Sequence, residues 1–226
     1  YVSRGQCSLT LFAYEFLFFL MEFLVNRSFL LAVTGGIGCG KSWVMERLGQ
    51  WSFVTMSCDE VAHTLLEENG ALGEQLVKQF GDEILMESGQ INRAVLAERV
   101  FVDESARSML NALVHPLVGE KVAAWMEERR SSMEWGAVEI PLLFECGWHT
   151  WDWDAVLAVR ADEAVVRERL AARGWSSAEM EQRMAAQWPV ERKCEQADFI
   201  LETSEPTIEV ERKLRAQVMR WQQEGT

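Results

Sequence analysis

The chain has 226 residues, of which 49% are hydrophobic and 25% charged, a balance typical of a folded globular protein. Its net charge is −13, from 22 basic and 35 acidic residues, which argues against non-specific binding to nucleic acid or to an anionic membrane. The cysteines are odd in number (five) and include no C-x-x-C pair, so we expect no disulfide framework and a reducing compartment.

The first 28 residues differ in composition from the rest of the chain. Residues 9–25 are apolar, but they are few for a membrane span and are interrupted by two glutamates. We expect residues 1–28 to be an N-terminal extension that is dispensable up to about residue 20, so that a chain starting at Met21 folds and stays active. An amphipathic helix packed on the domain is one alternative, and a membrane anchor, disfavoured by the two carboxylates, is the other.

From residue 29 onward, short apolar segments alternate with helical patterns. The run at 29–34 is apolar almost throughout and precedes a glycine loop, which is typical of a central parallel strand buried on both faces. The alternation predicts an α/β fold of the P-loop NTPase type, with a parallel sheet flanked by helices. We expect strands at residues 29–34, 52–57, 135–140, 154–159 and 198–202.

The segment at residues 60–133 is longer than one crossover between parallel strands requires. It has helical spacing, with breaks predicted near residues 69–70, 81 and 88–89 and at Pro116. We therefore expect an all-helical insertion, the usual place for a second-substrate site. Further helices are expected at 41–50, 162–173, 177–187 and 206–222.

The strongest motif follows the first strand and fits G-x-x-x-x-G-K-[ST]. Its glycines let backbone N–H groups turn toward a phosphate, and the helix that follows points its positive end at the same phosphate. The lysine of this pattern reaches the β- and γ-phosphates, and the serine hydroxyl binds Mg²⁺. The sequence therefore predicts a site for ATP and Mg²⁺, with Ser42 as metal ligand. Its residues are Gly35, Gly36, Ile37, Gly38, Cys39, Gly40, Lys41 and Ser42.

Two acidic residues lie at or just after the ends of strands in the predicted sheet. Asp59 comes just after the second strand, at the sheet edge where open parallel sheets bind ligands. A carboxylate there can orient an acceptor hydroxyl and take its proton. Alternatively, Asp59 caps a helix that begins at Glu60, and the two roles are compatible. Glu139 ends the third strand and is either a second acidic group near the metal or a surface carboxylate.

A basic cluster stands out in this acidic chain. Arg169 and Arg173 are four residues apart, and Arg183 and Gln187 repeat the spacing. Phosphoryl transfer needs mobile positive charge over the transferring group, so we expect residues 162–192 to form a helical lid. A solvated basic face held by salt bridges is the alternative.

The chain resembles the dephospho-CoA kinase family over about residues 29–203. The phosphate loop is shared by many families, whereas an ordered set of further motifs is specific to this one. These motifs are FGDEIL at 80–85, GQINR at 89–93, LVHP at 113–116, PLLFE at 141–145, RLAAR at 169–173, RMAAQ at 183–187 and ADFI at 197–200.

The resemblance implies phosphorylation of the ribose 3′-hydroxyl of dephospho-CoA by ATP and Mg²⁺, giving CoA and ADP in the final step of coenzyme A biosynthesis. It implies a kinase domain at 29–226, with a CoA-binding insertion at 60–133 and a lid at 162–192. We expect a cytoplasmic monomer with no nucleic-acid or membrane partner. The expected catalytic residues are Lys41, Asp59, Arg169 and Arg173, and the expected substrate-binding residues are Asp59, His115, Pro141, Leu142, Glu145 and Arg183.

The chain departs from the family pattern in two places. Ser57 replaces the first aspartate of a D-x-D motif whose second member is kept as Asp59, which weakens a metal or positioning role at the first position. Residues 202–205 replace a loop that usually reads Asp-Asn-x-Gly, which puts side-chain contacts to adenine in doubt. Two other functions stay open: a kinase for another nucleotide or nucleoside, and a weakly catalytic nucleotide-binding regulatory module.

Overall fold

The computed structural model describes residues 27–67 and 70–224, with Val102 described by its backbone alone. The extension expected at residues 1–28 therefore lies outside the described residues, except for its last two positions. Within the described ranges, no helix combines the length and the apolar character that crossing a membrane requires.

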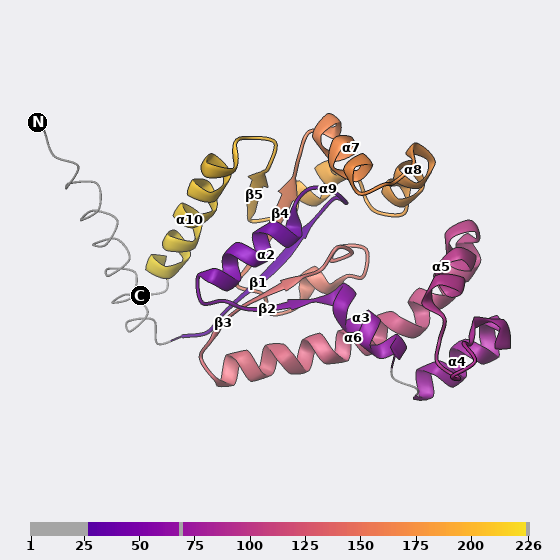
Figure 1. The fold of residues 1–226 in the computed structure, drawn as a ribbon. Helices are drawn as coiled ribbons and strands as arrows, with labels where there is room; N and C mark the ends of the chain where they lie inside the picture. The colour runs from indigo at the N-terminus through magenta and orange to yellow at the C-terminus, as the bar shows by residue number, and fades with distance from the viewer. Residues whose placement is uncertain (1–26, 68–69, 225–226) are drawn as a thin grey trace, which may run out of the picture.

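A single parallel sheet with the strand order β2-β3-β1-β4-β5 forms the centre of the molecule (Figure 1). This confirms the expected α/β class. The second strand is shorter than predicted because Ser52 has a positive φ of 67° and forms part of the turn before the strand. The strands are β1 (Phe29–Gly35), β2 (Val54–Ser57), β3 (Trp135–Glu139), β4 (Ala155–Arg160) and β5 (Phe199–Glu202).

Helices cover both faces of the sheet, and a group of them projects beyond it (Figure 1). Helices α2 (Lys41–Gln50), α3 (Cys58–Glu67), α6 (Glu104–Ser131), α7 (Glu163–Ala172) and α10 (Thr207–Glu224) pack on the sheet. Helices α4 (Ala71–Phe80) and α5 (Arg93–Val102), with the 3₁₀ turn η1 (Asp82–Ile84) between them, form the projecting part. Helices α8 (Ser177–Ala185) and α9 (Val190–Cys194) follow α7, and a second 3₁₀ turn, η2 (Trp148–Thr150), precedes β4. The short helix α9 was not predicted.

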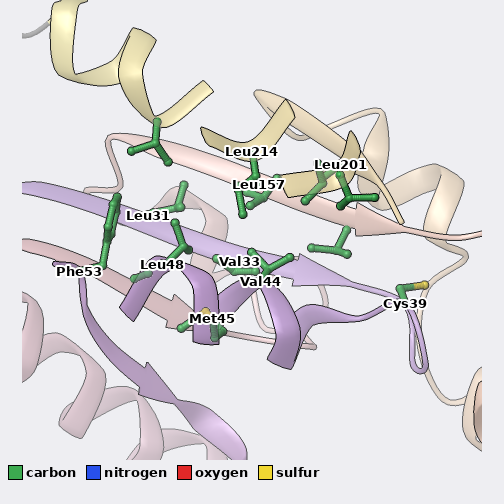
Figure 2. Packing of buried hydrophobic residues seen from close by; sticks show 14 of the residues in the cluster. Leu31, Val33, Cys39, Val44, Met45, Leu48, Phe53, Leu157, Leu201 and Leu214 are labelled. Carbon is green, nitrogen blue, oxygen red and sulfur yellow. The ribbon is translucent and has the colours of Figure 1, made fainter. Parts of the chain in front are cut away.

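Strand β1 is the middle of the hydrophobic core, because all seven of its residues are buried. Alternate side chains of a strand point to opposite faces, so Leu31 and Val33 pack toward α2 and α10 (Figure 2). Leu30 and Ala32 pack toward α3 and α6 on the other face. Burial on both faces explains why the strand is a continuous apolar run rather than an alternating one.

The helix break predicted at Pro116 is wrong, because α6 is continuous from Glu104 to Ser131. Proline removes one backbone hydrogen bond and frees the carbonyl four residues earlier. Pro116 and Ala112 both lie on the exposed side of α6, where water can satisfy that carbonyl. Val114 and Val118 are buried on either side of the proline, so packing on the sheet keeps the helix intact.

The helix expected to begin at Glu60 begins at Cys58 instead, directly after β2. Asp59 therefore lies inside the first turn of α3 and is not its N-cap. The hydroxyl of Ser57 accepts the backbone N–H of Glu60 at 3.5 Å, which is the capping contact that serine commonly makes. The capping role proposed for Asp59 is thus wrong, and Ser57 fills it.

Two glycines with opposite surroundings test this packing. A Cβ added to Gly136 on β3 would lie 2.6 Å from Cη2 of Trp125 and 3.2 Å from Cδ2 of Leu30. We expect Gly136→Ala to lower the free energy of unfolding by about 1–3 kcal/mol through overpacking. Gly49 is exposed on α2, and a Cβ there meets only Thr55, at 3.8 Å. Gly49→Ala should therefore raise the free energy of unfolding by about 0.5–1 kcal/mol. Urea unfolding of both variants checks the pair, and equal shifts would contradict the described packing.

Candidate active site

A cavity of about 520 Å³ lies over the carboxyl ends of the strands, the edge where open parallel sheets bind ligands. The strand order places β2 and β3 on one side of β1, and β4 and β5 on the other. The phosphate loop after β1 therefore lies between the acidic residues and the segment after β5. The lining residues that were also named from the sequence are Ile37, Gly38, Gly40, Lys41, Ser42, Asp59, Glu139, Arg169, Arg173 and Arg183.

The phosphate loop has the backbone shape that its glycines allow. Gly35 has a φ of 140°, and a Cβ there would lie 2.1 Å from the carbonyl oxygen of Val159, so only glycine fits. Gly40 has a left-handed conformation and caps α2, whose first turn contains no acidic residue and no side-chain cap. The first N–H groups of α2 are thus free of side-chain caps and can bind an anion.

Lys41 lies under this loop and is only 8% exposed. Its Nζ donates to the carbonyl oxygens of Gly35 at 3.3 Å and of Gly36 at 3.0 Å. Burial lowers the pKa of Lys41, and the negative charge of Glu139 opposes that shift. The ammonium is thus held against the loop, where the negative charge of a bound phosphate would stabilise it.

Two carboxylates line the cavity beside Lys41. Glu139 lies in the cavity wall and not on an outer surface, which favours the first of its two predicted roles. Burial raises the pKa of Glu139, Asp59 raises it further, and Lys41 lowers it. Among the described residues, no donor hydrogen-bonds to the carboxylate of Asp59 or Glu139, and the nearby Ser42 is exposed. Carboxylate and hydroxyl oxygens are the hard ligands that Mg²⁺ prefers, so this set fits the ion expected from the sequence.

Arg169 ties the phosphate loop to the end of β5 and is not a free lid cation. Its guanidinium donates to the carbonyl of Gly38 at 3.3 Å and to the hydroxyl and carbonyl of Thr203 at 3.0 and 2.7 Å. The hydroxyl of the buried Thr203 in turn donates to the carbonyl of Cys39 at 2.7 Å. Arg169 therefore positions the loop, and its side chain is already engaged before any ligand binds.

The other lid arginines differ in their surroundings. Arg173 is exposed at the cavity, and within the described ranges no carboxylate lies at ion-pair distance from it. Arg167 pairs with Glu163 at 2.7 Å and with Glu181 at 2.5 Å, as the solvated-face alternative predicts. The predicted lid thus carries both kinds of arginine, and Arg173 is one that is available to a phosphate.

Four predicted substrate-binding residues lie outside the cavity. Glu145 pairs with Nζ of the fully buried Lys193 at 2.8 Å, and Lys193 also donates to the carbonyl of Pro141 at 2.6 Å. These contacts join the segment after β3 to α9. Leu142 lies in the same segment, half-buried.

His115 lies on α6 in a separate groove of about 730 Å³. Its Nδ1 is 3.4 Å from Sγ of Cys146, and burial lowers the pKa of His115. The structure therefore does not bring His115 to the phosphate loop.

Cys39 is buried among core residues at the tip of the phosphate loop (Figure 2). It lies behind the loop with Gly36 and does not line the cavity. Burial raises the pKa of the Cys39 thiol, which disfavours a reactive thiolate. Cys39 is thus a filling residue of the loop.

Several cavity residues were not predicted from the sequence. Trp43 and Trp175 line it with Thr203, Glu205 and Thr207. Trp43 directly follows Ser42 in the first turn of α2, so its position along the chain could have indicated it. No sequence pattern marks Trp175 or Thr207. Thr203 and Glu205 belong to the loop at residues 202–205, where the family resemblance placed contacts to adenine and where this chain departs from the family pattern.

Known proteins resemble this chain over most of its length. The family model described as dephospho-CoA kinase matches residues 29–209. A dephospho-CoA kinase from Geobacillus kaustophilus is 36% identical over 84% of this chain and 96% of its own length. One from Streptococcus pneumoniae is 34% identical over 77% of this chain and 87% of its own.

A solved dephospho-CoA kinase from Campylobacter jejuni has a TM-score of 0.68 at 25% identity and covers 88% of this chain and all of its own. A solved Thermus thermophilus protein has a TM-score of 0.69 at 33% identity, over 86% of this chain and 98% of its own. The family model and the relatives both span most of the chain, and the phosphate loop and both carboxylates lie within the matched residues. The chain therefore belongs to the dephospho-CoA kinase family of phosphotransferases.

Proposed function

We propose that this chain transfers the γ-phosphoryl group of ATP to the ribose 3′-hydroxyl of dephospho-CoA, giving CoA and ADP. The observation that carries the proposal is one cavity that holds Lys41 and Ser42 of the phosphate loop together with Asp59 and Glu139. A phosphoryl donor and a hydroxyl acceptor need this combination of anion-binding and proton-accepting groups.

ATP, the phosphoryl donor, lies along the sheet edge, and the strand order indicates which end of the molecule lies on which side. Its phosphates bind the loop and the first turn of α2, with Lys41 beneath them. The acidic residues lie on the β2–β3 side, so the γ-phosphate points there. The nucleobase then lies on the β5 side, where Trp43 and Thr207 line the cavity.

Mg²⁺ fits the oxygen ligands of Ser42 and Glu139. When bound with ATP, the ion neutralises charge on the β- and γ-phosphates. Two protein oxygens suffice, because Mg²⁺ keeps several waters and takes further ligands from substrate phosphates. This agrees with the absence, among residues 27–67 and 70–224, of any cluster of three or more acidic, histidine or cysteine ligands.

Asp59 accepts the acceptor's proton. A sugar hydroxyl is a weak nucleophile, so a carboxylate that orients it and takes the proton speeds attack on the γ-phosphorus. The new bond joins the 3′-oxygen to phosphorus as the bond from phosphorus to the oxygen of ADP breaks. Lys41 and Arg173 stabilise the charge on the transferring group.

The second substrate reaches this site from the helical insertion. Asp59 lies at the start of α3, which begins the helical segment between β2 and β3, so an acceptor bound there can present its ribose to the carboxylate. We further propose that the enzyme acts as a monomer in the cytoplasm, a reducing compartment in which the free thiols of Cys39, Cys58, Cys146 and Cys194 stay reduced.

An acceptor screen with purified protein, ATP and Mg²⁺ tests the activity. We expect dephospho-CoA to be phosphorylated far faster than AMP, CMP, adenosine or shikimate, with the new phosphate on the 3′-oxygen by mass spectrometry and NMR. EDTA should abolish turnover, and added Mg²⁺ should restore it. Preference for another acceptor would reassign the substrate, and no transfer in a single turnover would leave only the regulatory alternative.

Asp59→Asn tests the proton acceptor. The substitution keeps the size of the side chain and removes its charge, so kcat should fall by about 10²–10⁴-fold, the usual contribution of a general base. The melting temperature should change little, because Ser57 and not Asp59 caps α3. Glu60→Gln is a matched control, because it removes the neighbouring carboxylate of the same helix turn and should keep wild-type kcat. Near-wild-type kcat in Asp59→Asn would refute the assignment.

Arg173→Ala and Arg169→Ala should have different effects. Arg173 makes no ion pair with a described residue and is exposed, so its loss should lower kcat by about 10²–10³-fold, the range for one charge-stabilising donor, at unchanged stability. Arg169 joins Gly38 to Thr203, so its loss should also lower the free energy of unfolding by about 1–3 kcal/mol. Turnover assays and thermal melts separate the two effects. Arg167→Ala, on the outer face of the same helix, is the control, and unchanged kcat in Arg173→Ala would make that side chain a surface residue only.

A further inference from the structure

The lid and the helical insertion touch each other through side chains. Nε2 of Gln182 on α8 donates to the backbone carbonyl of Phe101 on α5. The guanidinium of Arg183, next along α8, lies 5.8 Å from the ring centroid of Phe101 and 4.1 Å from that of Trp175. Figure 1 shows α8 and α5 facing each other from opposite sides of the active-site edge.

These contacts involve one wall of the nucleotide cavity, because Arg183 and Trp175 both line it. Within the described ranges no carboxylate lies at ion-pair distance from Arg183. The closest acidic neighbour in sequence on its face, Glu179, accepts hydrogen bonds from the N–H and hydroxyl of Ser176 in a capping box. The two aromatic rings are thus the direct contacts that orient the guanidinium.

Phe101 and Trp175 come from different parts of the fold. Trp175 belongs to the lid itself, in the turn before α8, whereas Phe101 belongs to the insertion between β2 and β3. A cation above an aromatic face is attracted by the ring quadrupole. Arg183 therefore contacts one ring inside the lid, that of Trp175, and one ring in the insertion, that of Phe101. Phe101 also accepts the hydrogen bond from Gln182.

We propose that Phe101 is a positioning residue that couples the two substrate sites by holding Arg183 and the lid against the insertion. The proposal rests on the proposed function, in which the lid covers ATP and the insertion holds dephospho-CoA. A ligand that orders the insertion then favours the lid position that completes the ATP cavity, and the reverse holds as well. Such coupling is reciprocal by thermodynamic necessity.

The coupling is measured as a ratio of affinities. The dissociation constant of a non-hydrolysable ATP analogue, AMP-PNP with Mg²⁺, is determined by calorimetry with and without saturating dephospho-CoA. We expect the wild-type ratio to be at least about fivefold, the lower end of typical coupling between sites. Phe101→Leu keeps an apolar side chain of similar bulk but has no aromatic face. It should lower the ratio by about two- to fivefold, which corresponds to ~0.5–1 kcal/mol for an exposed cation–aromatic contact.

Three further variants separate positioning from packing. Phe101→Tyr keeps the ring and should restore the ratio. Gln182→Leu leaves the insertion unchanged, removes the other contact and should also lower the ratio, so it carries the test if Phe101→Leu does not fold. Arg192→Gln is the matched control, because Arg192 lies 3.4 Å above the ring of Trp188 but does not reach the insertion, and it should leave the ratio unchanged.

The outcomes distinguish this inference from the proposed function. If the wild type phosphorylates dephospho-CoA but its affinity ratio is one, the coupling is refuted and the function stands. If folded Phe101→Leu and Gln182→Leu keep the wild-type ratio, or if Arg192→Gln lowers it equally, Phe101 has no positioning role. If the wild type binds both ligands and transfers no phosphate, the proposed function is refuted, and the affinity ratio alone decides whether the two sites are coupled.

Discussion

The active site depends on how firmly the phosphate loop is held. Its own lysine binds it from inside through the carbonyls of Gly35 and Gly36, and Thr203 binds it from the β5 side through the carbonyl of Cys39. With these carbonyls occupied, the loop can present its N–H groups to an anion. The same contacts attach the lid to the loop, because Arg169 donates hydrogen bonds to both Gly38 and Thr203.

The unpaired positive charges of the lid are concentrated at the active site. The chain carries a net charge of −13, yet the cavity contains Lys41 and three arginines beside its carboxylates. Elsewhere on the lid Arg167 is neutralised by two glutamates, whereas no carboxylate pairs at close range with Arg173 or Arg183 among the described residues. An acidic protein can therefore bind polyanionic substrates, because Arg173 and Arg183 at the cavity have no close acidic partner among the described residues.

Features encoded locally could be predicted from the sequence, and features set by distant segments could not. The buried run of β1 and the glycine spacing of the loop are local patterns, so the fold class and the position of the phosphate loop followed from them. The continuity of α6 through Pro116 depends on packing against the sheet, and the role of Arg169 depends on Thr203, 34 residues away. Glu145 matched a family motif, but its partner Lys193 lies on α9, a helix that no periodic pattern indicated.

The replacement of the first aspartate by Ser57 is understandable from the sheet register. Ser57 on β2 pairs with Glu139 on β3, and neighbouring strands are about 4.8 Å apart. An aspartate at position 57 would place a third carboxylate beside Glu139, whose pKa is already raised by burial and by Asp59. Serine avoids that repulsion and caps α3, while Glu139 supplies an acidic oxygen at the same sheet edge. In the proposed mechanism the two remaining carboxylates have separate roles, Asp59 toward the acceptor and Glu139 toward the metal.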